Sequence, residues 1–172
     1  GFCDVLRHVA RVFAQEPDKV SHNAGLLIGA LNEREDRPGA QMPDDDALTD
    51  LTQRMLRAVD GKTGGLAGAP KFPQWNFFWL LWRGGIRYDN AQARQGVDIT
   101  LTHICQGGIY DHLGGGFARY SVDAQWLAPH FEKMLYDQAQ LAIAYLEARQ
   151  ATSEAVYGWV AHDIFAYVRR DL

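Results

Sequence analysis

The sequence predicts an all-α protein of about seven helices joined by long glycine-rich loops. Apolar residues recur at intervals of three and four in successive segments, which is the spacing of amphipathic helices. No segment carries a convincing strand pattern. Two Gly-Gly pairs, at residues 64–65 and 107–108, each follow a predicted helix. They lie about 43 residues apart, which is the length of a helical hairpin unit.

Two helices are expected before residue 43. The first covers residues 4–15, with its apolar side chains on one face. The second begins near Pro17, a residue that suits the first helical position, and extends to about residue 32. The polar stretch 32–46 contains Pro-Gly and a further proline, which predicts a linker.

Five more helices are expected in the rest of the chain. They cover residues 44–59, 75–87, 90–106, 129–149 and 153–171. Pro129 suits the first position of the sixth helix, and Ser153 is the expected N-cap of the seventh. The fourth helix is aromatic on several sides, so we expect it to be buried between layers. Residues 109–110 and 117–122 are expected to form at most short extended pieces.

Composition and charge exclude several kinds of partner. The net charge is −4 and no stripe of Lys and Arg stands out, so nucleic acid is not expected. The longest dense apolar run, residues 77–82, is far shorter than the roughly 20 residues that cross a membrane. Charged residues interrupt the N-terminal segment where a secretory signal needs an apolar run. Cys3 and Cys105 form no CxxC pair, which favours a reducing cytoplasmic compartment.

No metal or cofactor is expected from the motifs. The potential ligands His103, Cys105, His112 and His130 do not have the spacing of a zinc site. No phosphate-binding loop, dinucleotide fingerprint or nucleophile elbow is present.

Residues 107–128 form the loop that we expect to carry the chemistry. Ordered loops of this length in a compact domain are usually functional. Aromatic side chains, Tyr120 and Trp126 among them, stand near the polar residues Asp111, His112 and Arg119. Aromatic faces stack on the apolar faces of sugars while polar groups bind the hydroxyls, so the loop predicts a small sugar-like ligand.

The same polar residues have a structural interpretation. Arg119 would then pair with Asp111 or Asp123, and His112 would cap a helix. Lys71, in the proline-bounded stretch APKFP, has the same two interpretations. It either reaches the ligand cavity as a binding residue or is an exposed loop lysine.

The predicted sixth helix continues the cluster. Four of its residues share one face: His130, Met134, Asp137 and Leu141. His130 and Asp137 would then lie within reach of each other, and such a pair can perform general acid–base catalysis. The alternative is that they form a buried structural pair. Glu132 and Tyr136 lie on a different side of the predicted helix. Glu132 is a further candidate acid, and Tyr136 is a candidate substrate-binding residue. The alternative for Glu132 is a solvated or interhelical ion pair with Lys133.

Two motifs give the sequence a family resemblance. The signature of the thioredoxin-domain-containing proteins related to spermatogenesis-associated protein resembles residues 107–141, GGIYDHLGGGFARYSVDAQWLAPHFEKMLYDQAQL. An earlier glycine-rich motif of that family resembles residues 64–73, GGLAGAPKFP. The two motifs stand in the family's order and spacing.

The resemblance implies an architecture. The family is similar to the six-hairpin glycosidase superfamily, which includes N-acylglucosamine 2-epimerase-like proteins. Residues 44–172 would be the first hairpins of an incomplete (α/α)6 barrel. Residues 1–43 would be a helical connecting segment that follows a thioredoxin-like domain, the implied partner in the same chain. Because hairpins would be missing, exposed apolar faces predict self-association.

The resemblance also implies a chemistry. The barrel relatives isomerise or hydrolyse sugars through His or carboxylate groups, which implies a sugar epimerase, an isomerase or a glycoside hydrolase here. The candidate catalytic residues are Asp111, His112, His130, Glu132 and Asp137. The alternatives are a non-catalytic binding or scaffold module, or an inactive fragment, associated with a redox domain.

Overall fold

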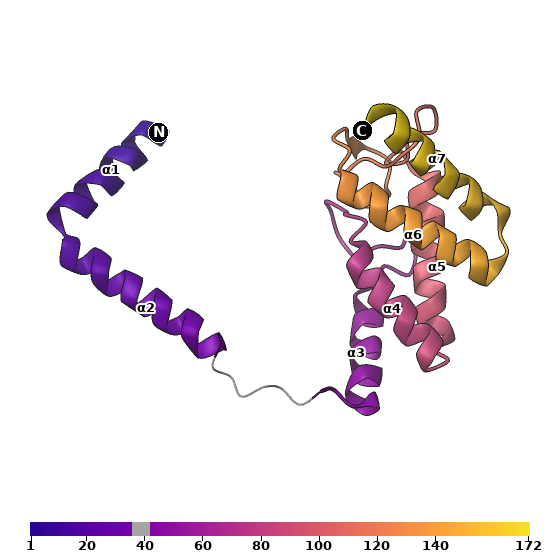
Figure 1. Ribbon diagram of the computed structural model, residues 1–172, viewed down its shortest axis with the longest axis horizontal. Helices are drawn as coiled ribbons and strands as arrows, with labels where there is room; N and C mark the ends of the chain where they lie inside the picture. Colours follow the sequence, from indigo (N-terminus) through magenta and orange to yellow (C-terminus); the bar gives the residue numbers. More distant parts are fainter. Residues whose placement is uncertain (36–41) are drawn as a thin grey trace. The chain divides into compact units, whose positions relative to one another are not determined.

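The computed structural model describes residues 1–35 and 42–172 (Figure 1). The chain divides into two compact units, Gly1–Pro43 and Asp44–Leu172, which are described separately. Part of the predicted linker, residues 36–41, lies outside the described residues. The prediction of an all-α protein is confirmed, with seven helices in the part of the chain described.

The first unit consists of helices α1 (Phe2–Gln15) and α2 (Pro17–Glu35). The carboxylate of Asp4 accepts a hydrogen bond of 2.8 Å from the N-terminal amine, in the first turn of α1. Pro17 begins α2, as predicted from its fixed φ and missing N–H. None of the α1 side chains is buried. Its apolar stripe is therefore exposed.

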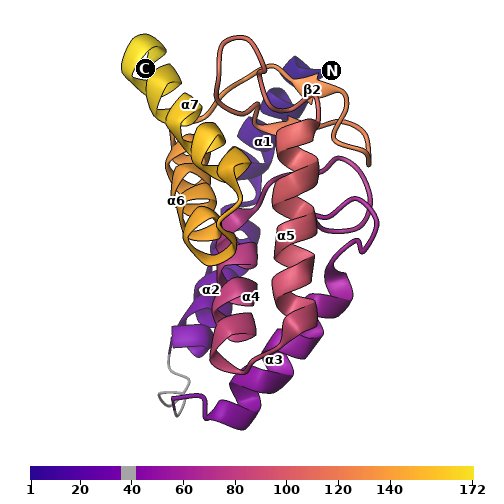
Figure 2. The same cartoon turned by 90° about the vertical axis from the view of Figure 1, so that its right-hand side faces the viewer.

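The second unit contains five helices. They are α3 (Asp45–Ala58), α4 (Trp75–Arg87), α5 (Ala91–Gln106), α6 (Leu135–Thr152) and α7 (Ala155–Asp171). Helices α6 and α7 form an antiparallel hairpin, and α4 packs against α3, α5 and α6 (Figure 2). Asp44 and Asn90 cap α3 and α5 by accepting the backbone N–H three residues later, at 2.8 and 3.0 Å.

The sixth helix begins later than predicted. Residues Pro129–His130 form strand β2, which pairs antiparallel with β1 (Tyr120–Ser121). The backbone N–H of Arg119 donates to the carbonyl of Glu132 at 2.7 Å, so the pairing continues beyond His130. This ladder holds residues 129–132 extended, and α6 starts only at Leu135. The predicted helical face that joined His130 to Asp137 was wrong. Strand β1 lies within residues 117–122, where a short extended piece was expected, whereas the extended Pro129–His130 was not expected.

Two smaller expectations were also wrong. Ser153 ends α6 with a φ of +63°, and Glu154 is the N-cap of α7. Helix α4 is not buried on all sides, because Trp79 and Leu80 are 46% and 45% exposed. Its other face carries Phe78 and Leu81, which are both fully buried.

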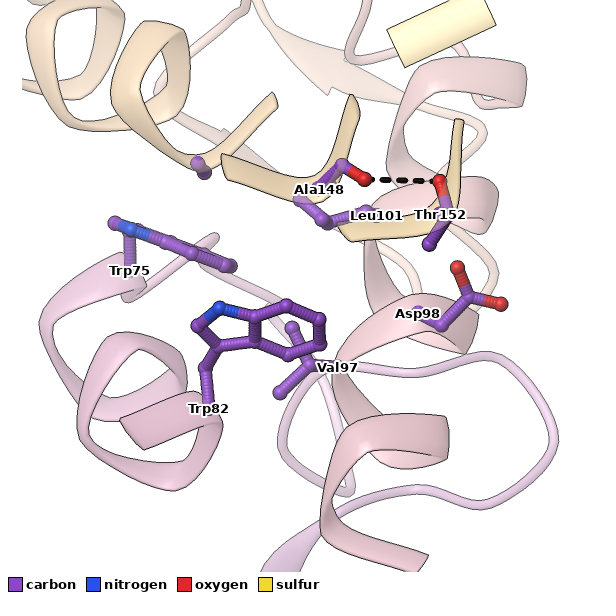
Figure 3. Close-up of a pocket in the computed structure, with 8 residues that line it drawn as sticks. Trp75, Trp82, Val97, Asp98, Leu101, Ala148 and Thr152 are labelled. Atoms are coloured by element: carbon purple, nitrogen blue, oxygen red, sulfur yellow. Dashed lines mark hydrogen bonds between the residues drawn. The ribbon is translucent and has the colours of Figure 1, made fainter. Parts of the chain in front are cut away.

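The core lies where α4, α5 and α6 meet. Trp82 of α4, Val97 and Leu101 of α5, and Ala148 of α6 surround a void of about 10 Å³ (Figure 3). Thr152 closes its rim, where its hydroxyl donates to the Ala148 carbonyl at 2.8 Å. A void of this size holds at most about one water molecule, so the helices are closely packed here.

The two glycine-rich loops meet at one end of the second unit. The loop that follows α5 lies at the end of the unit where α5 ends and α6 begins (Figure 2). Gly65, with a φ of +70°, lies so close to the Trp126 indole that a Cβ at this position would overlap the ring. Gly65 therefore marks a close approach between segments that are about 60 residues apart.

Candidate functional site

Lys71 joins the two glycine-rich loops. Its backbone exchanges two hydrogen bonds of 2.8 Å with Ser121. Its ammonium group donates to Asp60 Oδ2 at 2.9 Å, and to Thr63 Oγ1 and the Gly64 carbonyl at 2.6 Å each. The side chain is fully buried. An ammonium group has three protons, and these three acceptors engage all of them, so Lys71 is not an exposed lysine.

Trp126 is also part of this buried hub. The residue is fully buried, and its Nε1 donates to the Thr63 carbonyl at 2.8 Å. The Lys71 ammonium lies 5.4 Å from the ring centroid, which is cation–π distance. The predicted ligand-stacking face of Trp126 is therefore occupied by the protein itself.

Asp111 anchors the turn at the glycine triplet. Its carboxylate accepts from the backbone N–H groups of Leu113 and Gly114 at 3.0 and 2.8 Å, and from Lys133 Nζ at 2.8 Å. The Gly114 bond and the Lys133 ammonium lower the pKa of Asp111 to about 2. The group is thus a carboxylate at any ordinary pH, with no proton to donate. Lys133 pairs with Asp111, so the predicted ion pair between Glu132 and Lys133 does not form.

His112 lies on the exposed side of the same loop. The carbonyl of Gly107 accepts from its Nε2 at 3.1 Å, and its ring meets Tyr110 edge-on at 4.9 Å. His112 and Asp111 line a groove of about 390 Å³ with Phe131 and other residues. Asp137 does not line this groove, so these candidates do not share a pocket with it.

A second polar cluster joins the β1–β2 ladder to the first turn of α6. Arg119 Nη1 donates to Glu132 Oε2 at 3.0 Å, and neither Asp111 nor Asp123 pairs with Arg119 among the described contacts. The pKa of Arg119 is raised, first by this hydrogen bond and then by the nearby Tyr136. Strand pairing thus brings together residues that the sequence pattern assigned to a loop and a helix.

Asp137 is the exceptional carboxyl group of this cluster. Its Oδ2 is buried, and no group in the described part of the chain donates a hydrogen bond to it. Burial raises the pKa of Asp137 to about 6, although the charge of Arg119 acts in the opposite direction. The carboxyl group therefore titrates near neutral pH, which suits proton transfer.

Aromatic rings stack beside the ladder. Tyr120 stacks on Phe72 at 4.7 Å and on His130 at 4.6 Å between ring centroids. Pro129 and Phe131 line the groove of Asp111, and strand side chains alternate, so His130 lies on the other face. The exposed His130 ends the column of three rings.

Sequence reasoning missed Gln138. This amide is fully buried, accepts from the Phe117 N–H at 2.8 Å and donates to the Phe117 carbonyl at 2.7 Å. It therefore fixes the second half of the long loop to α6. The signal for it was a polar residue on the same helical face as Leu141 and Tyr145, which are both fully buried.

The described residues contain neither a metal-ligand cluster nor a membrane-spanning helix. Within residues 1–35 and 42–172, no group of three or more His, Cys, Asp or Glu residues is arranged to hold a metal ion. No helix in the described part of the chain is long and apolar enough to cross a membrane.

The fold and the cluster define a class: an all-α module with glycine-rich loops at one end of a helical bundle and an unpaired, buried carboxyl oxygen in the first turn of α6. The whole chain is similar to spermatogenesis-associated protein 20 of Homo sapiens and of Mus musculus, with 38% and 45% identity over 180 residues. An uncharacterized protein of Caenorhabditis elegans is 30% identical over 99% of the chain.

These relatives are much longer than the chain. The chain spans about a quarter of their length, 23% of the two mammalian proteins and 24% of the nematode protein. No family model matches the chain. The chain is thus related over its whole length to one segment of spermatogenesis-associated protein 20, which supports the family resemblance of the two motifs.

Proposed function

We propose that the second unit contributes an acid–base site for a small sugar-like ligand, with Asp137 as the proton-transfer group. The observation that carries the proposal is the unpaired, buried Asp137 Oδ2. A buried carboxyl oxygen without a hydrogen-bond donor costs stability, and perturbed carboxyl groups of this kind concentrate at functional sites. Its pKa of about 6 supplies both protonation states near neutral pH.

The surrounding residues have roles that fit such a ligand. The ring of His130 and the column beneath it offer a face for the apolar side of a sugar ring. Arg119, Glu132 and Tyr136 offer hydrogen-bonding groups for hydroxyls. The reaction class is epimerisation, isomerisation or glycoside hydrolysis, with His130 or Glu132 as the second acid–base group. We also infer that the unit forms part of an (α/α)6 barrel, whose other hairpins complete the cavity.

The test is saturation-transfer NMR of the chain against a panel of mono- and disaccharides. At least one sugar is expected to bind, and Asp137→Asn and His130→Ala are expected to weaken that binding at least about tenfold, a typical loss for a buried hydrogen-bonding contact. Asp111→Asn serves as the control, because Asp111 lines a different groove. A panel without any bound sugar, or unchanged binding by Asp137→Asn, contradicts the proposal.

A non-catalytic scaffold is the second candidate, and a specific observation favours it. Lys71, Asp111 and Lys133 are all engaged in contacts that fix the loops. The partner would be the thioredoxin-like domain that the family resemblance implies. Co-purification of that domain with the chain, undisturbed by Asp137→Asn, supports the scaffold. Loss of the complex in that variant supports the ligand site.

A further inference from the structure

The groove beside the glycine triplet combines buried and exposed apolar side chains. Its volume is about 390 Å³. Ile109, Tyr110 and Ala118 line it and are buried. Leu113 and Phe131 also line it, and they are fully and 88% exposed, the highest values among the large apolar residues of the second unit. Exposed apolar side chains that adjoin a concave apolar surface are typical of a binding groove.

Hydrogen bonds fix the backbone that carries these two exposed side chains. The Asp111 carboxylate accepts from the Leu113 N–H at 3.0 Å, within the turn at the glycine triplet. Phe131 precedes Glu132, whose carbonyl accepts from the Arg119 N–H at 2.7 Å. The groove is therefore largely formed in the free chain, so a ligand that enters it loses little of its binding energy to ordering the protein.

The two charged groups of the groove compensate each other. Lys133 Nζ donates to Asp111 Oδ2 at 2.8 Å and to the Gly115 carbonyl at 2.7 Å. The same ammonium group lies 4.2 Å from the centroid of the Tyr167 ring, which is cation–π distance. The charge of Lys133 thus has three partners within the protein, and the groove offers no uncompensated charge to a ligand.

The uncharged polar groups of the groove are also engaged. The Tyr110 hydroxyl donates to Asp163 Oδ2 at 2.7 Å. His112 Nε2 lies 3.1 Å from the Gly107 carbonyl, which only accepts, so this nitrogen carries a proton. Among the described contacts, Nδ1 of His112 is the one side-chain polar atom of the groove lining without a partner. A sugar needs several such atoms for its hydroxyls, so this groove does not match a sugar.

We propose that this groove is a second binding site, which takes a small, uncharged aromatic molecule. Its volume falls within the range of small-molecule sites, roughly 300–1,000 Å³. The rings of Tyr110, His112 and Phe131 line it, and rings of this kind pack well against another aromatic ring. The site goes beyond the proposed function and does not depend on it, because Asp137 does not line this groove.

The experiment is an NMR titration of the nitrogen-15-labelled chain with indole, an uncharged aromatic probe. The largest amide shifts are expected at lining residues such as Gly108 and Ala118. Phe131→Ala is expected to weaken indole binding roughly two- to tenfold, the range for one aromatic contact. Trp159→Ala is the matched control, because Trp159 is an exposed aromatic residue of α7 outside the groove, and the affinity is expected to stay unchanged.

A charged probe tests the chemical class of the ligand. Indole-3-acetate is expected to bind no more tightly than indole, because Asp111 already compensates the charge of Lys133. Tighter binding of the acetate overturns the uncharged class.

Three other results overturn the site itself. They are indole shifts spread over other faces, an unchanged indole affinity in Phe131→Ala, and a Phe131→Ala chain that dissociates in sedimentation equilibrium without any change in indole binding. The last result identifies the groove as an interface between copies of the chain. Phe131 is exposed, and retained amide chemical-shift dispersion verifies the fold of the variant. Asp137→Asn is expected to leave indole binding intact, so this proposal and the proposed function fail separately.

Discussion

Replacement of Lys71 by methionine tests the buried hub that joins the two loops. The change removes the ammonium group and retains most of the apolar stem. It leaves Asp60, Thr63 and the Gly64 carbonyl without their common donor. Breaking a buried ion pair from one side typically costs about 3–5 kcal/mol. The Asp60 side chain is 24% exposed and regains some hydration, so we expect a loss of roughly 3 kcal/mol in the free energy of unfolding.

The assay is equilibrium urea denaturation followed by tryptophan fluorescence. With a slope of about 2 kcal/mol per molar urea, the midpoint of Lys71→Met is expected to fall by about 1–2 M. Lys62→Met is the matched control, since Lys62 is an exposed lysine of the same loop, and its midpoint is expected to stay within about 0.3 M of the unchanged chain. A loss below about 1 kcal/mol refutes the hub, because that is the effect of an exposed pair.

The stability difference between Lys71→Met and the unchanged chain is expected to depend on pH in a defined direction. Lys71 holds the pKa of Asp60 well below its ordinary value of 3.8. A depressed carboxyl pKa contributes stability that is present above the unfolded value and is lost as pH falls toward the folded value. The difference between Lys71→Met and the unchanged chain is therefore expected to shrink below about pH 4. A difference that grows on acidification contradicts the ion pair.

Three further predictions follow from other contacts. In thermal melts, Asp137→Asn is expected to stabilise the chain by roughly 1–2 kcal/mol at pH 7.5 and to have no effect below about pH 4. The reason is that the raised pKa of Asp137 costs stability only where the carboxyl group has lost its proton. Destabilisation at pH 7.5 contradicts this prediction. Asp111→Asn is expected to lower the free energy of unfolding by roughly 1–2 kcal/mol at neutral pH and by less toward pH 2. The ion pair with Lys133 weakens as the Asp111 carboxylate is protonated. A loss that does not depend on pH contradicts this prediction. Gly65→Ala is expected to cost about 3 kcal/mol or more in urea denaturation, because a methyl group meets the Trp126 ring at positive φ; a neutral result means that the loop shifts freely.

The self-association predicted from the sequence has a direct measurement. Large apolar side chains of the second unit are more than 40% exposed: Trp79, Leu80, Ile143, Leu146, Trp159 and Phe165 are among them. Where such side chains are contiguous, they are typical of surfaces that bind another polypeptide. Sedimentation equilibrium of the chain at micromolar concentration is expected to show a dimer or larger species. A monomer over the whole concentration range contradicts the prediction.

Much of the helical fold was predictable because its signals are local. Periodic apolar residues located all seven helices, and Pro17 marked where the second one begins. The glycine pair at 107–108 correctly marked the end of α5, whereas α3 already ends at Ala58, before the pair at 64–65. These signals act within one or two helical turns, so they do not depend on the rest of the fold.

The candidate site was predictable only as a set of residues, and the tertiary structure decided how they combine. Pro129 is a helix start signal for the stretch 129–134, yet pairing with Tyr120–Ser121 holds the start of this stretch extended. The hydrogen bonds of the ladder satisfy backbone N–H and C=O groups that would otherwise form a helical turn. That pairing places the His130 ring against Tyr120 and the Glu132 carboxylate against Arg119.

The long loop from 107 to 128 shows the same division. Its sequence identified aromatic and charged residues in the right place, and it determined the family resemblance. The tertiary structure decided that Asp111 and Lys71 are bound by the protein and that Asp137 Oδ2 is buried without a hydrogen-bond partner among the described residues. Burial and pairing depend on partners far away in the sequence, and those partners set each group's charge and availability.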